Sequence, residues 1–182
     1  MTELLAEYIA AVESMTAADI ENLEAQGCRP EIISGLLVDP GISLLGKVCA
    51  ITHTDGTWAP SDLGQWRYAT PAIDGDLIDL IAWQPSAPAK MFTRTGLASL
   101  VNVEAVMMAH YSAEPLFLHS NILSWFKADS VGAVPVRFDA GLALALGGVE
   151  VICDTPQLAR KVAAACDIGR PKISYIRKME AA

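Results

Sequence analysis

The hydrophobic pattern of the chain changes its period near Lys47, and this change limits the folds that it can adopt. In the first part, apolar residues recur at helical spacing, as in Leu5, Tyr8, Ile9, Val12 and Met15. From Lys47 to Arg94 they fall in short runs that Pro, Gly and Ser separate. Helices followed by a series of strands predict an α+β protein.

We expect the first part, residues 1–45, to form an acidic helical head. A Thr16-x-x-Asp19 motif is a helix start signal, and Gly27 ends that helix. Pro30 suits the first turn of a third helix, which Asp39-Pro40-Gly41 stops. Residues 1–40 hold eight acidic residues and one basic residue, so this segment carries most of the net charge of -8.

We expect the remainder, residues 46–182, to form an α+β body that packs with the head as one compact unit. Residues 46–95 are predicted to form an antiparallel β-meander, with strands at Lys47–His53, Gln65–Thr70, Asp76–Trp83 and Lys90–Arg94. Residues 96–130 are predicted to be helical, and Pro115 separates a helix at Leu97–Tyr111 from one at Leu116–Lys127.

Residues 131–182 are predicted to form a ββαβ unit. Two strands, Leu142–Leu146 and Val149–Cys153, flank a Gly147-Gly148 hairpin turn. Thr155 is a natural N-cap with Pro156 in the first helical turn, and Lys172–Ile176 supplies the last strand.

Three aspartates in the segment DGDLIDLIAWQP (74–85) raise the question of an acidic catalytic pair. Side chains alternate between the two faces of a strand, so Asp76 and Asp79 point in opposite directions and do not act on one substrate atom. Counting along a hairpin with its loop at 84–89 places Asp79 opposite Arg94. We therefore predict an Asp79–Arg94 pair that sets the strand register, with Arg67 as the alternative partner.

Signals for catalysis or metal binding are weak. His53, His110 and His119 have no metal-ligand spacing, the four cysteines include no C-x-x-C pair, and no Gly-x-Ser-x-Gly elbow is present. The weak catalytic candidates are Asp154, His53 and Asp79. Asp154 stands at the end of a strand and could hold Mg²⁺, but no second acid is fixed near it. We expect no bound metal and no cofactor.

Nucleic-acid binding has one candidate region. The acidic head has the wrong sign for phosphate contacts, and no Walker A or G-x-G-x-x-G sequence occurs. The C-terminal segment is basic: it contains Arg170, Lys172, Arg177 and Lys178 around Tyr175. These four residues could contact nucleic acid. The simpler interpretation is that they are solvated charged residues beside the last strand.

Three segments in order carry a resemblance to a known group: DLIDLIAWQPSAPAKMFTRTG (76–96), PLFLHSNILSWFKADSVGAVPV (115–136) and GLALALGGVEVICDTPQLARKV (141–162). Together they resemble uncharacterised bacterial proteins that prophages and integrated elements encode, a domain of unknown function. The chain departs from that pattern at Phe117–His119, where a W-R-like pair is expected. The resemblance implies no catalytic residues, and it points toward nucleic-acid-processing proteins or nucleic acid as partners.

These observations favour a non-catalytic accessory or interaction protein of a bacterial mobile element. Its partner would be another protein or a second copy of the chain, with nucleic acid as an option through the basic C-terminus. The alternative functions are a metal-assisted phosphoester hydrolase and a weak nucleic-acid-binding protein. The chain has no apolar run of membrane-spanning length and begins without a basic signal region, so we expect a cytoplasmic protein and no membrane partner.

Overall fold

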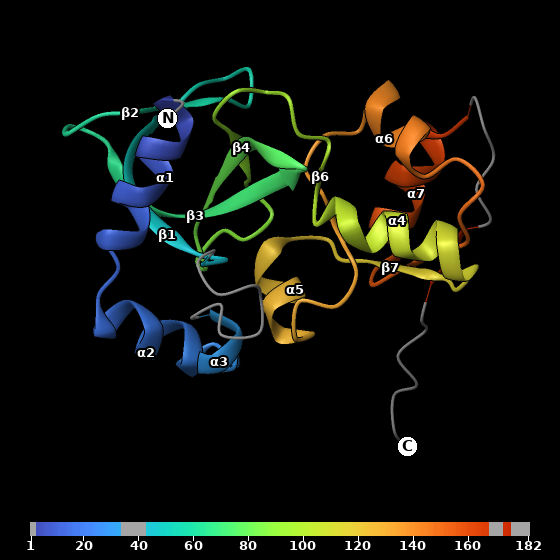
Figure 1. The fold of residues 1–182 in the computed structure, drawn as a ribbon, viewed down its shortest axis with the longest axis horizontal. Helices are drawn as coiled ribbons and strands as arrows, with labels where there is room; N and C mark the ends of the chain where they lie inside the picture. Colours follow the sequence, from blue (N-terminus) through green and yellow to red (C-terminus); the bar gives the residue numbers. More distant parts are fainter. Residues whose placement is uncertain (1–2, 34–42, 168–172, 176–182) are drawn as a thin grey trace.

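The computed structural model describes residues 3–33, 43–167 and 173–175 (Figure 1). The chain begins with helices α1 (Glu3–Glu13), α2 (Ala17–Ala25) and α3 (Pro30–Ile33). A five-stranded antiparallel sheet follows, made of β1 (Gly46–Thr52), β2 (Trp58–Pro60), β3 (Gln65–Asp74), β4 (Asp76–Trp83) and β5 (Phe92–Thr93). Helices followed by a meander confirm the α+β class.

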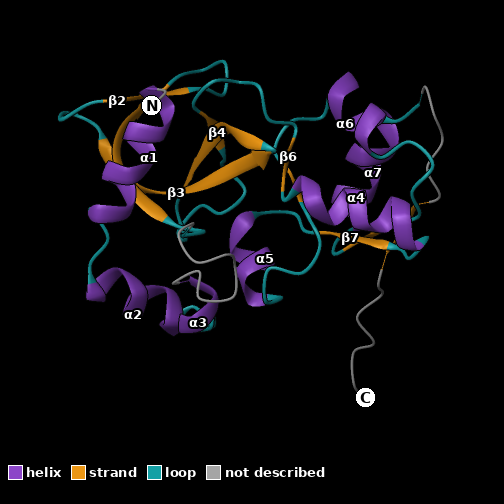
Figure 2. Ribbon diagram, viewed as in Figure 1, coloured by secondary structure: helices purple, strands orange, loops and turns teal. Residues whose placement is uncertain are grey.

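The second half of the chain mixes short strands and helices. In chain order they are β6 (Leu100–Val101), α4 (Val103–Ser112), β7 (Leu116–Leu118), α5 (Ile122–Lys127), β8 (Val134–Pro135), α6 (Ala140–Ala145), β9 (Val151–Cys153), α7 (Pro156–Ala165) and β10 (Ile173–Tyr175). Strands β6 and β8 pair with each other, and β10, β9 and β7 form a parallel sheet. Figure 2 shows this half beside the five-stranded sheet.

The start signal of the second helix is confirmed as a capping box. The Thr16 side chain accepts a hydrogen bond from the Asp19 backbone N–H, and the Asp19 carboxylate accepts one from the Thr16 backbone N–H at 3.0 Å. Gly27, with φ of 93°, follows this helix, as predicted. The later part of the third predicted helix and its stop at Asp39-Pro40-Gly41 lie outside the described residues.

The five-stranded sheet curls until its two edge strands meet. Its order is β2-β1-β3-β4-β5, and a bridge between Thr57 and Thr93 joins the ends of that series. The Thr93 N–H donates to the Gly56 carbonyl at 3.0 Å across this junction. Inside the curl, the buried Trp58 donates its indole N–H to the Leu80 carbonyl at 2.9 Å. The sequence did not predict β2, the short strand that makes this closure.

Helices cover both faces of this sheet. Helix α1 packs on one face, where a Cβ at position 46 would lie 2.7 Å from the Cβ of Ala11, so only glycine at position 46 allows this close approach. The opposite face of the sheet belongs to a larger core. The buried side chains that join it to α2, α3 and α5 include Leu23, Ile32, Tyr68, Ile81, Trp83, Ile122, Trp125 and Phe126.

Several expectations for the second half were wrong in detail. The helix expected at Leu97–Tyr111 begins only at Val103, because Leu100–Val101 pairs with β8 as strand β6. Residues 142–146, expected as a strand, lie in and just after helix α6, because Asp139 caps that helix by accepting from the N–H groups of Gly141 and Leu142. Gly147-Gly148 therefore follows a helix and is not a hairpin turn. Leu116–Leu118 forms strand β7 instead of a first helical turn, because it pairs in parallel with β9, a partner distant in sequence. The helix with Thr155 as N-cap and Pro156 at its start is confirmed as α7.

Asp79 lies in the middle of β4, fully buried, with backbone N–H groups around its carboxylate. It accepts five such hydrogen bonds at 2.7–3.2 Å, from Leu80, Arg94, Thr95, Leu97 and Ala98. Gly96, with φ of 75°, lets the chain turn so that the amides before and after it point at one carboxylate. The carboxylate thus holds the segment that follows the sheet against β4.

The predicted side-chain pair between Asp79 and Arg94 is wrong. Strand β4 pairs Ile81 with Thr93, so the alignment differs by one residue from the expected one, and the Arg94 side chain lies on the other face of the sheet. Its guanidinium binds Glu7 of α1 through two hydrogen bonds of 2.8 Å. Arg94 meets Asp79 through its backbone N–H at 2.7 Å instead. Arg67, the alternative partner, donates to Gln65.

We predict that Asp79→Ala lowers the free energy of unfolding by at least about 3 kcal/mol, because five N–H groups lose this acceptor. The N–H groups of Arg94 and Leu97 keep a second acceptor, in the Leu80 carbonyl and the Thr95 hydroxyl. Urea denaturation followed by circular dichroism measures this loss. Asp76→Ala removes an exposed carboxylate from the same strand and should change the free energy by less than about 0.5 kcal/mol. Equal losses in the two variants would contradict this role of Asp79.

Candidate functional site

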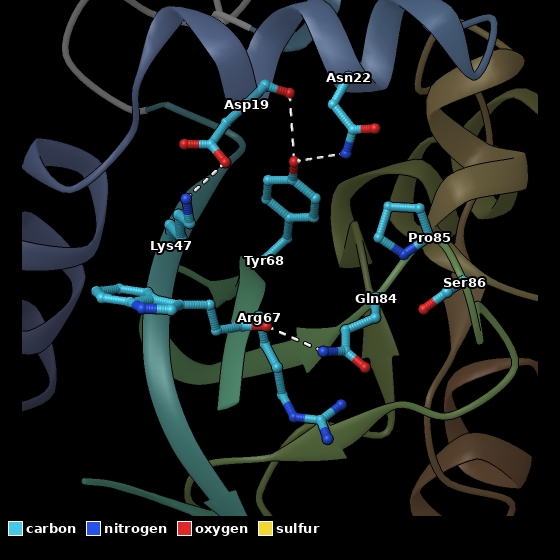
Figure 3. A pocket seen from close by; sticks show the side chains of 9 residues that line it. Asp19, Asn22, Lys47, Arg67, Tyr68, Gln84, Pro85 and Ser86 are labelled. Carbon is cyan, nitrogen blue, oxygen red and sulfur yellow. Dashed lines mark hydrogen bonds and ion pairs between the residues drawn. The ribbon is translucent and has the colours of Figure 1, made fainter. Parts of the chain in front are cut away.

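A polar pocket of about 230 Å³ opens between helix α2, strands β1 and β3, and the loop after β4 (Figure 3). Its lining residues are Asp19, Asn22, Lys47, Trp66, Arg67, Tyr68, Gln84, Pro85 and Ser86. The register of β1 and β3 places Lys47 directly across from Tyr68, and Trp66 comes two residues before Tyr68. These three side chains therefore project from the same face of the sheet.

An ion pair forms one wall of the pocket. The Lys47 ammonium lies 2.7 Å from the Asp19 carboxylate, and the two side chains are 25% and 11% exposed. Burial alone would raise the pKa of Asp19, but the hydrogen bonds from Lys47 and Thr16 outweigh it and lower the pKa. The Asp19 carboxylate is therefore ionised at neutral pH, and the Lys47 ammonium beside it compensates its charge.

The Tyr68 hydroxyl connects this wall to helix α2. It donates to the Asp19 carbonyl at 3.3 Å and accepts from the Asn22 amide at 3.2 Å (Figure 3). Burial raises the pKa of Tyr68, so the hydroxyl stays protonated at neutral pH. On the opposite wall, the Gln84 amide donates to the Trp66 carbonyl at 2.9 Å. These bonds hold the pocket in shape without a ligand.

Trp66 gives the pocket its apolar surface. Its side chain is 57% exposed, whereas Trp58, Trp83 and Trp125 are at most 2% exposed. The Lys47 ammonium lies 5.4 Å from the centroid of the Trp66 ring. The backbone of Trp66 belongs to a strand that pairs on both sides, so the indole stands on a rigid support.

The candidate catalytic residues do not share this pocket. The Asp79 side chain is fully buried, and backbone N–H groups surround its carboxylate. His53 is exposed beside a turn, where its backbone N–H donates to the Thr57 carbonyl. Asp154 follows β9, and its Oδ2 accepts from the backbone N–H and the hydroxyl of Ser120, at 2.8 and 3.0 Å. Each of the three therefore lies in a separate structural setting.

Asp154 retains one feature that a hydrolase would use. Its Oδ1 is buried and has no hydrogen-bond partner among the described residues. His119 lies next to Ser120 in the chain, but the contact of its Nε2 with the Val131 carbonyl, at 2.8 Å, occupies that nitrogen. In the described part of the chain, no three His, Cys, Asp or Glu side chains are grouped as metal ligands.

The basic nucleic-acid candidates Arg170, Lys172, Arg177 and Lys178 lie outside the described residues. The cysteines are free thiols, and burial, with a smaller effect of Asp154, raises the pKa of Cys153 to about 12. Across the ranges that the structure describes, no helix combines the length and the apolar character needed to cross a membrane.

No protein-family model, no curated protein and no solved structure matches this chain. The candidate site therefore stands on its geometry. Sequence reasoning missed the pocket, because the strand pattern assigned Trp66 no special role. The signal that could have found it is the alternation of Trp66 and Tyr68 on one strand, together with Lys47 on the strand that pairs with it.

We predict that Lys47→Met raises the pKa of Asp19, because the variant loses the hydrogen bond and the positive charge that favour the carboxylate. A carbon-detected NMR titration of the Asp19 carboxyl measures the change directly. In the native protein, the pKa of Asp19 is lower in the folded state than in the unfolded state. Its contribution to stability is therefore present above the unfolded pKa and is lost as the pH falls through the folded pKa.

Asp19→Asn should for this reason flatten the acid side of the plot of unfolding free energy against pH. Asp62→Asn, which removes one exposed carboxylate outside the pocket, is the control for the loss of a single charge. An acid limb of unchanged steepness in Asp19→Asn would contradict the assignment.

Proposed function

We propose that this chain is a non-catalytic accessory protein of a bacterial mobile element that binds its partner at the pocket around Trp66. The observation that carries the binding role is the exposed indole on a rigid, pre-formed pocket. An exposed tryptophan loses the benefit of burial in the free protein, and tryptophan is enriched among the residues that dominate binding energy. The mobile-element origin rests on the resemblance of residues 76–176.

The settings of the candidate catalytic groups support a role in binding. The Asp79 carboxylate accepts five backbone hydrogen bonds, so its oxygens are not available to a substrate. The pocket residues are similarly engaged with one another, through the Lys47–Asp19 pair and the Tyr68 hydroxyl. A general base must lie within hydrogen-bond reach of the proton that it removes, and the buried Asp79 carboxylate does not line the pocket.

The alternative is a metal-assisted phosphoester hydrolase that uses Asp154. Its support is the buried, unpartnered Oδ1 of that residue. A hydrolase of this kind needs at least one further ligand to fix a divalent ion, and the nearest described contacts of Asp154 are the backbone and hydroxyl of Ser120. We therefore favour the binding role.

Incubation of the purified full chain with bis-p-nitrophenyl phosphate and Mg²⁺ or Mn²⁺ separates these functions. We expect release of p-nitrophenol at the rate that the metal alone produces. Metal-dependent turnover by the native protein would overturn the non-catalytic proposal if it disappears in Asp154→Asn. The control variants Ser120→Ala and Asp62→Asn should remain folded. Thermal unfolding curves of the variants serve as the folding control.

A further inference from the structure

Trp66 is the pocket feature that calls for a ligand with a flat face. The indole is 57% exposed and stands on a strand that pairs on both sides. A flat π-system can stack on such a ring without any change in the backbone. Stacking of a base on an aromatic side chain tolerates every base, because each base has a π-face.

The loop opposite Trp66 offers hydrogen-bonding groups for the edge of such a ligand. The Gln84 amide nitrogen donates to the Trp66 carbonyl, and its Oε1 accepts no hydrogen bond from the described residues. Ser86 contributes an exposed hydroxyl to the same wall. A nucleobase carries donors and acceptors along its edge, so these two groups match its chemistry.

Arg67 lies between Trp66 and Tyr68 on β3 and opposite Val48, so its side chain projects from the other face of the sheet. Its side chain extends away from Tyr68 (Figure 3), and its guanidinium packs 5.2 Å from the ring centroid of Phe92. The Nε is buried without a partner, and within the described ranges no carboxylate pairs with this guanidinium. The neighbouring Lys47 differs, because its charge is compensated by Asp19. Among the lining residues, neither cation is therefore placed to bind a phosphate on the Trp66 side of the sheet.

We propose that this pocket binds the base of a nucleotide, which stacks on Trp66 and turns its edge toward Gln84 and Ser86. The proposal rests on the binding role of the pocket proposed above and names the class of ligand. Nucleotides occur both free and as units of single-stranded nucleic acid, and the chemistry is the same in both.

The charge of the chain determines how such binding depends on salt. The net charge is -8, and helix α2 brings the exposed Glu21 and Glu24 to the side of the pocket. Binding is therefore carried by stacking, and the phosphate stays in solvent. For a single strand, log K falls with log salt by about 0.7 for each phosphate neutralised. The stacking pocket, which neutralises no phosphate, predicts a slope near zero, whereas binding through the four C-terminal bases predicts a slope of about four times this value.

Fluorescence anisotropy of a labelled single-stranded thymidylate oligomer, titrated with the full chain, measures the affinity. Trp66→Ala should weaken binding by roughly 5- to 150-fold, the range for removing a stacked base contact, and Trp66→Phe should retain most of it. Tyr111→Ala removes a 90%-exposed aromatic ring from α4 and should leave binding unchanged. Competition with AMP then identifies the source of the nucleotide. If AMP displaces the labelled oligomer at a similar concentration, counted per nucleotide, the ligand is a free nucleotide. If AMP does not displace the oligomer, the ligand is the single strand.

Two results would overturn the nucleotide site. The first is no binding of either probe at low salt by a chain whose unfolding curve is native. The second is binding that Trp66→Ala leaves unchanged and that the combined substitutions Arg170→Gln, Lys172→Gln, Arg177→Gln and Lys178→Gln remove. Neither result bears on catalysis, so the non-catalytic function fails only in the hydrolysis assay, and the two proposals can fail separately.

Discussion

The rest of the structure depends on how the chain satisfies the carboxylate of Asp79. A charge buried without partners in a sheet would cost more free energy than a domain of this size can spare. Here the chain from Arg94 to Ala98 wraps around the charge and supplies most of the N–H groups that bind it. Arg94 uses its backbone for this purpose and its side chain to bind Glu7. One residue therefore joins helix α1, the sheet and the start of the second half.

The candidate site follows from the sheet that this arrangement holds in place. Because β3 is central, with β1 and β4 on its two sides, the side chains of Trp66 and Tyr68 have fixed directions. The buried Tyr68 faces the main core and packs at a ring-centroid distance of 5.4 Å from Trp83. Trp66, two residues earlier, lies where helix α2 no longer covers the sheet. The same strand thus supplies a core side chain and a surface for binding.

The sequence predicted the elements whose signals are local. The bounds of Asp76–Trp83, the Thr16 capping box and the Thr155-Pro156 helix start all depend on neighbouring residues. Residues 142–146 were misassigned because a short apolar run fits a helix or a strand equally well. Strand β7 and the pocket depend on pairing between distant segments, β7 with β9 and Lys47 with Tyr68, which periodicity does not encode. The predicted register of Arg94 against β4 was wrong by one residue, and a shift of one residue moves a side chain to the other face of the sheet.

The closure of the five-stranded sheet has a consequence for self-association. An open sheet edge presents unpaired backbone groups that can template a strand from another molecule. In this protein, the bridge between Thr57 and Thr93 joins the two edges, and Pro60 on β2 has no N–H to offer. Where β2 and β5 meet, the sheet therefore presents fewer unpaired backbone groups to another molecule. It can expose an aromatic ring to solvent while offering little backbone to which other chains could add.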